Sequence, residues 1–386
     1  MKRIVTGIGA LLASAAPVLA GGIERAPQSL APLFEQGNYL ELSFGGVNPD
    51  VSGQDLAVFG GRGTGDVAKG YGFAGLSYKH QFTDHLSGVF IMEQPFGADI
   101  AYAVGESVAF GGTSVEVNST TYTALLRYKF DNNFSVHGGL RGSRADANVT
   151  LTGAAYGALG VAPGYNVDLD SSWGVGWVAG VAYEIPEIAA RVSLTYNSPI
   201  EHDFDTTESG PLIDPDGPGP APAMPLLDGT SQTTVKTPRS WTLEGQTGIA
   251  ADTLLFGSIR WVNWSEFLVN PERLVAVTGA GLVELEDTTT YTIGVGRKFT
   301  ENWSGSLSFM YEPDGDDLVS PLAPTNGRKG VTVAAIYTRD NIKVTTGISY
   351  VKLGDAYAET GTPDVARARM SGNHAWAAGV RIGYSF

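Results

Sequence analysis

The feature that most constrains this chain is a regular series of strand-like segments joined by connections of two different lengths. From residue 39 onward, segments of about ten residues change polarity at every second position, which is the periodicity of a β-strand with two different faces. We count fourteen of them, an even number, as bacterial single-chain membrane barrels require. They are residues 39–47, 71–82, 85–94, 120–130, 133–143, 173–185, 188–199, 240–249, 252–264, 289–299, 302–312, 330–338, 342–352 and 373–386.

The connections between these segments alternate strictly between short turns and long loops. The short ones are residues 83–84, 131–132, 186–187, 250–251, 300–301 and 339–341. The long ones are residues 48–70, 95–119, 144–172, 200–239, 265–288, 313–329 and 353–372. Short periplasmic turns at one rim and long outer loops at the other are typical of outer-membrane barrels. A soluble β-sandwich has no reason to separate its loops in this way.

The first twenty residues are predicted to be a secretory signal. Lys2 and Arg3 precede an apolar run over residues 4–16, and Val18-Leu19-Ala20 forms a small-residue cleavage site. The apolar run is too short to span a bilayer, which takes roughly eighteen apolar residues, and no later stretch reaches that length. An embedded chain must then be a closed barrel, because only helices and closed barrels satisfy every backbone group in lipid. The sequence therefore predicts an exported, multi-pass β-barrel of the Gram-negative outer membrane.

Charge and cysteine content exclude several classes of function. Without the first twenty residues, 23 basic residues remain against 40 acidic ones, a net charge of −17. Nucleic acid binding rests on clustered Lys and Arg, so we expect no nucleic-acid partner. The chain has no cysteine, which excludes disulfides and thiolate chemistry.

Residues 21–38 lack any period and directly precede the first strand. We interpret them as a plug inside the barrel, which gives three parts: a signal peptide at 1–20, a plug at 21–38 and a fourteen-stranded antiparallel barrel at 39–386. The plug mixes apolar and charged residues, as suits a segment that packs inside a polar wall; its candidate residues are Gly22, Ile23, Glu24, Arg25 and Phe34. The alternative is a disordered periplasmic leader.

Strand parity places several charged side chains in the lumen. The inward set includes Arg127, His137, Arg141 and Arg260, and Arg127 is expected close to His137 across the turn at 131–132. An arginine can hold a carboxylate headgroup through charge-assisted hydrogen bonds. The same charges could instead pair with Glu24, Glu41 or Glu244 as bridges between wall and plug, and for any single residue we favour this second interpretation.

The sequence resembles a known family. The start of the mature chain, GGIERAPQSLAPLFEQGNYLELSFGGVNPDVSG, the third-strand sequence MEQPFGADIAY and the fourteen strands resemble the FadL/TodX-type outer-membrane transporters of long-chain fatty acids and other hydrophobic compounds. One departure is the absence of an Asn-Pro-Ala triplet associated with the plug. The Asn-Pro pairs of this chain, Asn48-Pro49 and Asn270-Pro271, fall in predicted outer loops.

The resemblance implies a mechanism of passive uptake. Outer loops would capture a hydrophobic molecule and pass it to a pocket in the lumen; plug movement would then release it sideways beside a kinked third strand. In this sequence the kink would lie at Pro95, Phe96, Gly97 and Ala98, where proline and glycine weaken strand pairing. Alternatively, Pro95 merely ends the strand. The implied partners are a hydrophobic ligand such as a fatty acid or hydrocarbon, outer-membrane lipid and lipopolysaccharide, and detergent in any crystal, with a monomer expected.

The sequence offers no enzyme, cofactor or metal motif that survives inspection. It has no Gly-x-Ser-x-Gly elbow and no His-Glu-x-x-His motif, and its five histidines are scattered. Loop 200–239 is Pro-rich and acidic, which predicts a solvated cover. Two other classes of function stay open: a general diffusion porin with an unplugged lumen, and a structural or adhesive barrel without a through-path.

Overall fold

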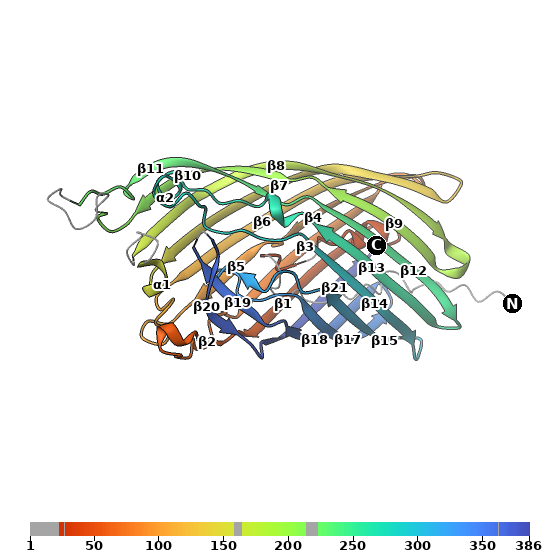
Figure 1. The fold of residues 1–386 in the computed structure, drawn as a ribbon. Helices are drawn as coiled ribbons and strands as arrows, with labels where there is room; N and C mark the ends of the chain where they lie inside the picture. Colours follow the sequence, from red (N-terminus) through yellow and green to blue (C-terminus); the bar gives the residue numbers. More distant parts are fainter. Residues whose placement is uncertain (1–22, 27, 158–163, 214–222, 362) are drawn as a thin grey trace.

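The computed structural model describes residues 23–26, 28–157, 164–213, 223–361 and 363–386. The predicted signal peptide and Gly22 lie outside the described residues. Within them the chain forms a closed antiparallel β-barrel (Figure 1). The barrel closes where β1 pairs with β21, from Tyr39↔Ser385 to Asp50↔His374.

Among the described residues, fourteen strands build the wall, and three of them are interrupted, so that each is formed by two consecutive segments. This confirms the predicted fold class and strand number. In chain order the wall strands are β1 (Tyr39–Asp50), β3 (Tyr71–Gln81), β4 (Leu86–Glu93) with β5 (Gly97–Ala101), β6 (Ser114–Lys129), β7 (Phe134–Leu151), β8 (Tyr165–Ile185), β9 (Ala190–Asn197) with β10 (Ile200–Ser209), β11 (Gly229–Thr237) with β12 (Ser240–Ala250), β13 (Thr253–Val262), β14 (Thr288–Lys298), β15 (Trp303–Glu312), β17 (Arg328–Arg339), β18 (Ile342–Leu353) and β21 (His374–Ser385).

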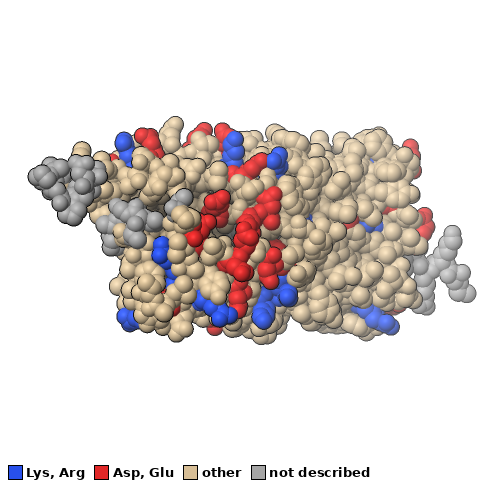
Figure 2. All heavy atoms as spheres, in the orientation of Figure 1, with Lys and Arg blue, Asp and Glu red and all other residues tan. Residues whose placement is uncertain are grey.

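The wall strands have an apolar outer face and a small or polar inner face. In β21 the outward side chains of Trp376, Ile382 and Tyr384 are exposed, whereas Ala375 and Ala377 are buried inside. Figure 2 shows few charged side chains on the half of the visible face toward the short turns, while acidic side chains gather nearer the long loops. This distribution is expected of a barrel whose outer surface meets lipid.

Several predicted loops are in fact partly wall. Loop 200–239, predicted as a solvated cover, contributes the strands β10 and β11, so that prediction was wrong. The acids Glu201 and Asp203 lie on the outer face of β10, and the inward positions Ile200 and Phe204 are buried. The inward face also carries His202, so polar residues on both faces hid the strand. Strands β6, β7 and β8 likewise extend further into predicted loops than expected.

The prediction that Asn48-Pro49 lies in an outer loop was also wrong. Both residues belong to β1 and pair with Trp376 and Ala375 of β21. The ladder between β1 and β3 has ended by then, at Val47↔Tyr71, so Pro49 lies where β1 has one ladder neighbour. Proline is tolerated at such edges because its missing N–H removes no ladder bond on the open side.

A small second sheet covers the outer end of the barrel. It contains β16 (Leu318–Val319), β19 (Ala356–Thr360), β20 (Val365–Met370) and β2 (Gly53–Asp55). The Asp55 carboxylate ties it to the neighbouring loop, since it accepts hydrogen bonds from the Ser107 hydroxyl at 2.7 Å and from the backbone N–H of Val108 at 2.6 Å. The described parts of the long outer loops therefore form a cap.

One short helix, η1 (Ala31–Phe34), precedes the first strand. The other short helices lie in the connections between strands: η2 (Ala57–Phe59), α1 (Ala154–Gly157), η3 (Pro186–Ile188), η4 (Trp264–Glu266) and α2 (Glu272–Thr278). None of the helices in the described part of the chain could reach across a membrane.

Candidate functional site

The third wall strand is interrupted at residues 94–96. The ladder of β4 with β6 ends at Glu93↔Thr121, and the ladder of β5 with β6 begins at Gly97↔Asn118. The strand resumes after the break, so Pro95 does not simply end it. At the break the Ser119 hydroxyl donates to the carbonyl oxygen of Phe96 at 2.7 Å and accepts from the Phe96 N–H at 3.1 Å. One serine thus replaces the missing ladder bonds.

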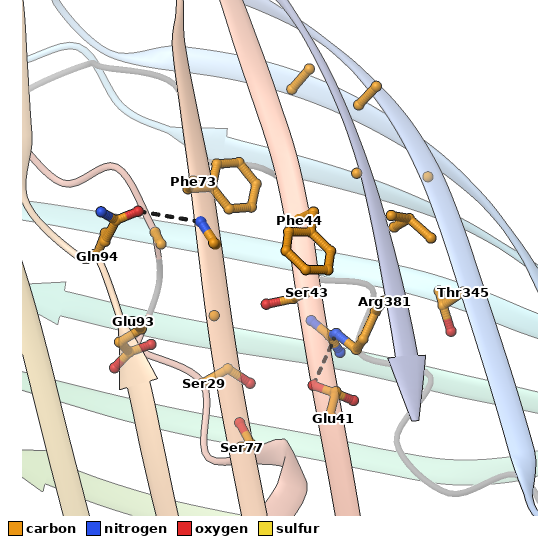
Figure 3. A pocket seen from close by; sticks show the side chains of 18 of the residues that line it. Ser29, Glu41, Ser43, Phe44, Phe73, Ser77, Glu93, Gln94, Thr345 and Arg381 are labelled. Atoms are coloured by element: carbon orange, nitrogen blue, oxygen red, sulfur yellow. Dashed lines mark hydrogen bonds and ion pairs between the residues drawn. The ribbon is translucent and has the colours of Figure 1, made fainter. Parts of the chain in front are cut away.

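The opposite side of the break is only loosely paired. The ladder of β3 with β4 stops at Leu76↔Met92. Beyond it the backbone N–H of Ala74 donates to the side-chain Oε1 of Gln94 at 3.2 Å, the dashed contact at the left of Figure 3. Between this contact and the start of β3 the described wall has no ladder. Backbone pairing resumes only before β3, where the Lys69 N–H donates to the Asp99 carbonyl oxygen at 3.0 Å and the Ala101 N–H donates to that of Val67 at 2.8 Å.

The N-terminal segment, by which we mean residues 23–38, fills this break from inside. The backbone N–H groups of Arg25 and Ala26 donate to the carbonyl oxygen of Pro95, at 2.7 and 3.2 Å. The N–H of Gly97 donates to the carbonyl oxygen of Ile23 at 2.8 Å. The segment acts as a short strand partner for the part of the third strand that has left the wall.

Side chains fix the same segment to the wall. Glu24 forms a buried ion pair with Arg260 of β13, with Nη2 2.6 Å from Oε1. The guanidinium of Arg25 lies over the Tyr71 ring, 4.5 Å from its centroid. Arg141 of β7 donates to the side-chain oxygen of Gln28.

The lower part of the segment is anchored near the short turns. The Phe34 ring lies between two cations, 4.6 Å from the guanidinium carbon of Arg127 and 4.1 Å from that of Arg191. Arg127 also pairs with Glu184 of β8, and Lys343 of β18 pairs with Glu35. Leu30 and Leu33, at the start of η1 and within it, are buried in one apolar cluster with inward residues of the wall. These wall residues are Val89, Ile91, Leu125 and Val178.

Two cavities lie on either side of residues 23–26. The upper one, of about 80 Å³, is lined almost entirely by apolar groups, among them Ile23, Phe96, Phe204 and Phe267. Its polar side chains have partners: the Thr237 hydroxyl donates to the carbonyl oxygen of Ile200, and the Asp146 carboxylate accepts from the side-chain amide of Asn118. The upper cavity therefore suits an uncharged, apolar group.

The lower cavity, of about 140 Å³, is more polar and lies behind the loosely paired wall (Figure 3). Phe73 and Ser77 of β3 and Glu93 of β4 line one side. On the other side Arg381 of β21 donates from Nε to Glu41 of β1 at 3.2 Å. This cavity reaches the part of the wall where the β3–β4 ladder has stopped.

The four inward residues proposed from the sequence surround the N-terminal segment and line neither cavity. Arg260 holds Glu24, and Arg141 holds Gln28. Arg127 and His137 are ladder partners beside Phe34, and the His137 Nε2 lies 3.1 Å from the Thr195 hydroxyl. Arg260 and Arg141 thus bridge the wall and the N-terminal segment. Arg127 and His137 contact the Phe34 ring and form their hydrogen bonds within the wall.

Sequence reasoning missed the polar residues that do line the lower cavity, such as Glu93 and Arg381. A signal was available for Glu93, because it has the same strand parity as the buried Val89 and Ile91. The same signal was available for Arg381, which has the strand parity of the buried Ala375 and Ala377.

Comparison with known proteins identifies the family. Residues 18–386 match the family described as outer membrane protein transport protein (OMPP1/FadL/TodX). The chain belongs to this family. It is thus a β-barrel of the Gram-negative outer membrane, as the FadL/TodX fold predicts.

Curated relatives of the chain cover it in part. A long-chain fatty acid transport protein of Escherichia coli O6:H1 is 24% identical over 229 residues, which are 55% of this chain and 50% of the relative. A protein of the same name from Salmonella typhi is 24% identical over 235 residues, 56% of this chain and 50% of the relative. The chain spans about half the length of the curated relatives it matches.

Solved structures share the FadL/TodX fold over nearly the whole chain. A FadL homologue of Pseudomonas aeruginosa superposes with a TM-score of 0.72 at 14% identity, covering 92% of both chains. The toluene transporter TodX of P. putida superposes with a TM-score of 0.64 at 15% identity, covering 91% of both chains. At these identities the likeness concerns the fold alone.

Proposed function

We propose that this chain is a passive transporter that takes up hydrophobic small molecules, such as long-chain fatty acids or hydrocarbons, across the outer membrane. Two of its relatives, a long-chain fatty acid transport protein and a toluene transporter, support this substrate class by their names. The outward apolar face of the wall supports lipid and lipopolysaccharide as its surroundings, and we expect a monomer.

The observation that carries the proposal is the position of residues 23–26. They hydrogen-bond to the interrupted third strand at Pro95 and Gly97, and they lie between the apolar upper cavity and the more polar lower one. A ligand moving from one cavity to the other must displace them. We therefore assign residues 23–38 the role of a plug, of which the part up to Ala26 is the movable gate.

The path follows from the two cavities. The outer cap receives the ligand, and the upper cavity holds its apolar part. When residues 23–26 move aside, the ligand reaches the lower cavity. It leaves sideways between β3 and the third strand, where the contact of Gln94 with the Ala74 N–H stands in for a ladder. A sideways exit keeps an apolar chain out of water throughout.

The anchored lower part of the plug supports sideways release over release into the periplasm. Phe34 and its two arginines, with the Lys343–Glu35 pair, close the end of the lumen that carries the short turns. Moving residues 23–26 leaves that closure in place.

The test compares the parent with a variant lacking residues 21–29, which keeps the anchored part, and a variant lacking residues 21–35. Each is reconstituted in liposomes, and ion conductance and uptake of a radiolabelled long-chain fatty acid are measured. A parent and a 21–29 deletion that import the lipid without conducting, with conductance appearing only in the 21–35 deletion, support the plugged transporter. A parent that already conducts freely and ignores the lipid is a porin and overturns the proposal.

A further inference from the structure

The wall has a second interruption, between β8 and the seventh strand. The ladder stops at Val178↔Asn197 and resumes at Leu169↔Thr206. Residues 170–177 of β8, all of them described, face the seventh strand without ladder partners there. This interruption is separate from the break in the third strand.

Two irregularities put the strands out of phase at this point. Asn197 and Ile200 of the seventh strand are both buried and inward although three positions separate them. On the other side, the register of β7 with β8 shifts between Ala145 and Ala147. A slip of one residue turns every following side chain to the opposite face of a sheet. Between the two slips the inward positions of β8 and the seventh strand do not align. The ladder between them is therefore absent there and resumes beyond both slips.

Side-chain packing closes the gap instead. Ile200 lies against Gly174 and Gly176 of β8, where an added Cβ would come within 2.5 Å of Ile200 Cγ2 and 2.7 Å of Ile200 Cγ1 respectively. At the lower corner the Ser198 N–H donates to the Trp177 carbonyl oxygen at 2.9 Å, and the Trp177 N–H donates to the Ser198 hydroxyl at 2.8 Å. We call this the β8–β10 seam. The backbone of β10 is close as well, since a Cβ added at Gly174 would clash with the Glu201 carbonyl oxygen. Opening the seam above that corner moves Ile200 and this backbone away from β8 and breaks no strand ladder.

The upper cavity lies next to the upper end of the seam. Leu169 of β8 and Ala145 of β7 line it on one side, and His202 and Phe204 of β10 line it on the other. His202 reaches past β8 to the carbonyl oxygen of Ser143, with Nε2 3.2 Å from that oxygen. The seam is thus a part of the wall that adjoins this apolar space and that no strand ladder closes.

The outer surface of the seam lies at the level of the outer leaflet. On β8 the outward side chains of Trp173, Val175 and Trp177 are 61%, 71% and 49% exposed. Trp177 contacts Tyr196, which contacts Trp241, with centroids 5.0 and 4.7 Å apart. Such rows of Trp and Tyr mark the interface between hydrocarbon and water. Above them, β10 turns charged residues outward.

We propose that the β8–β10 seam is an entrance through which the apolar chain of a molecule dissolved in the outer leaflet passes sideways into the upper cavity. The proposal rests on the proposed function of that cavity as the ligand site. A hydrocarbon chain leaves water for lipid, so the leaflet concentrates the ligand at the depth where the seam lies. The entrance lies beside the upper cavity, whereas the exit at the third strand lies beside the lower one.

The experiment uses a lipid that cannot leave the membrane. A phosphatidylcholine with a diazirine near the glycerol end of one acyl chain is incorporated in nanodiscs with the full chain, and photolabelling of Leu169 and Phe204 is mapped by mass spectrometry. Because the chain has no cysteine, Val175→Cys with Glu201→Cys forms a unique outward pair across the seam, which a short bis-thiosulfonate bridges reversibly. Ile200→Ala removes the side chain that closes the seam.

A matched pair controls for the chemistry. Ile293 and Phe309 are ladder partners on β14 and β15 and are both exposed, so Ile293→Cys with Phe309→Cys is bridged in the same way. We expect labelling of the upper cavity in the parent and in the bridged control. Bridging the seam should abolish this labelling, and reductant should restore it. Ile200→Ala should increase it. Labelling that persists in the bridged seam, or that is absent from both the parent and Ile200→Ala, overturns the entrance.

A second probe separates this proposal from the proposed function. A free diazirine-bearing decanoic acid, added from water, can reach the cavity through the outer cap as well. Labelling by this acid without labelling by the tethered lipid overturns the entrance and leaves the cavity as a ligand site. If neither probe labels the cavity, both the proposed entrance and the assignment of the cavity as the ligand site are wrong.

Discussion

The guanidinium of Arg260 donates to both oxygens of the Glu24 carboxylate, from Nη2 to Oε1 at 2.6 Å and from Nε to Oε2 at 3.3 Å. Both residues are buried, at 7% and 8% exposure. Arg260 also donates to the hydroxyls of Ser240 and Thr242. The wall thus holds the gate through one fully hydrogen-bonded ion pair.

Glu24→Gln tests the strength of this pair. Removing one partner of a buried ion pair leaves the other charge uncompensated, which costs about 3–5 kcal/mol. We expect the gate to open in a larger fraction of molecules, so that uptake of a labelled long-chain fatty acid into liposomes rises while ion conductance stays absent, because the anchored part of the plug still closes the lumen. Arg260→Met together with Glu24→Gln removes both charges and should bring uptake back toward that of the parent. Equal uptake by the parent and Glu24→Gln would contradict the assignment of residues 23–26 as a gate.

Phe34→Ala tests the anchor of the plug. The ring lies between the guanidinium groups of Arg127 and Arg191, and each cation–π contact contributes about 0.5–2 kcal/mol. We expect residues 30–36 to become sensitive to a protease added from the periplasmic side. Phe34→Tyr retains an aromatic face and is expected to stay resistant. Protease resistance of Phe34→Ala would show that Leu30 and Leu33 suffice as the anchor.

Ser119→Ala tests the break in the third strand. Its hydroxyl satisfies both the N–H and the carbonyl oxygen of Phe96, and leaving a buried polar group unsatisfied costs about 1–3 kcal/mol. We expect faster amide hydrogen exchange at Phe96 and Gly97 with unchanged exchange in β6. Ser119→Thr keeps the hydroxyl and is the matched control. Unchanged exchange at Phe96 in Ser119→Ala is the outcome that excludes this role.

The outer cap is expected to lose stability as the pH rises from about 4.5 toward 7. Burial, and then the neighbouring Asp364, raise the pKa of Glu359 in β19 to about 7. At a pH between the ordinary pKa of Glu359 and this raised pKa, the folded cap binds more protons than the unfolded chain. The contribution of Glu359 to stability is therefore full below its ordinary pKa. It falls as the pH rises through the pKa of the folded state. Limited proteolysis of the cap against pH measures this.

Glu359→Gln is the control for this pH dependence. The amide cannot ionise, so proteolysis of the cap should lose its dependence in this window while the barrel strands remain protected. An unchanged pH profile in the variant would assign the dependence to other groups.

The fold was predictable because the wall obeys a period of two. The alternation that defined the strands also places Arg127 opposite His137, and the two are ladder partners in the structure. Where both faces of a strand carry polar residues, the same rule fails. Strand β10 alternates acids with His202 and Thr206, and for this reason it was predicted as loop.

The candidate site was predictable only in part, because the N-terminal segment has no period. The sequence offered Glu24, Glu41 and Glu244 as partners of lumenal cations, and nothing in it distinguishes them. The structure pairs Glu24 with Arg260 and Glu41 with Arg381. The second pairing is set by the register of β1 with β21. The first depends on how deep the segment lies in the barrel, which is set by backbone bonds such as that from Arg25 to Pro95. Likewise, the β8–β10 seam arises from two compensating slips, each invisible in a single strand.

The closure of β1 against β21 has a consequence for assembly. This ladder joins strands from opposite ends of the barrel sequence, and such long-range pairings form late because the intervening loop must first be ordered. The N-terminal segment is continuous with β1 at Tyr39, so it must already lie inside when that ladder forms. Leu30 and Leu33 can then pack on β4 and β6 beforehand, and the nascent barrel would fold around its own plug instead of receiving it afterwards.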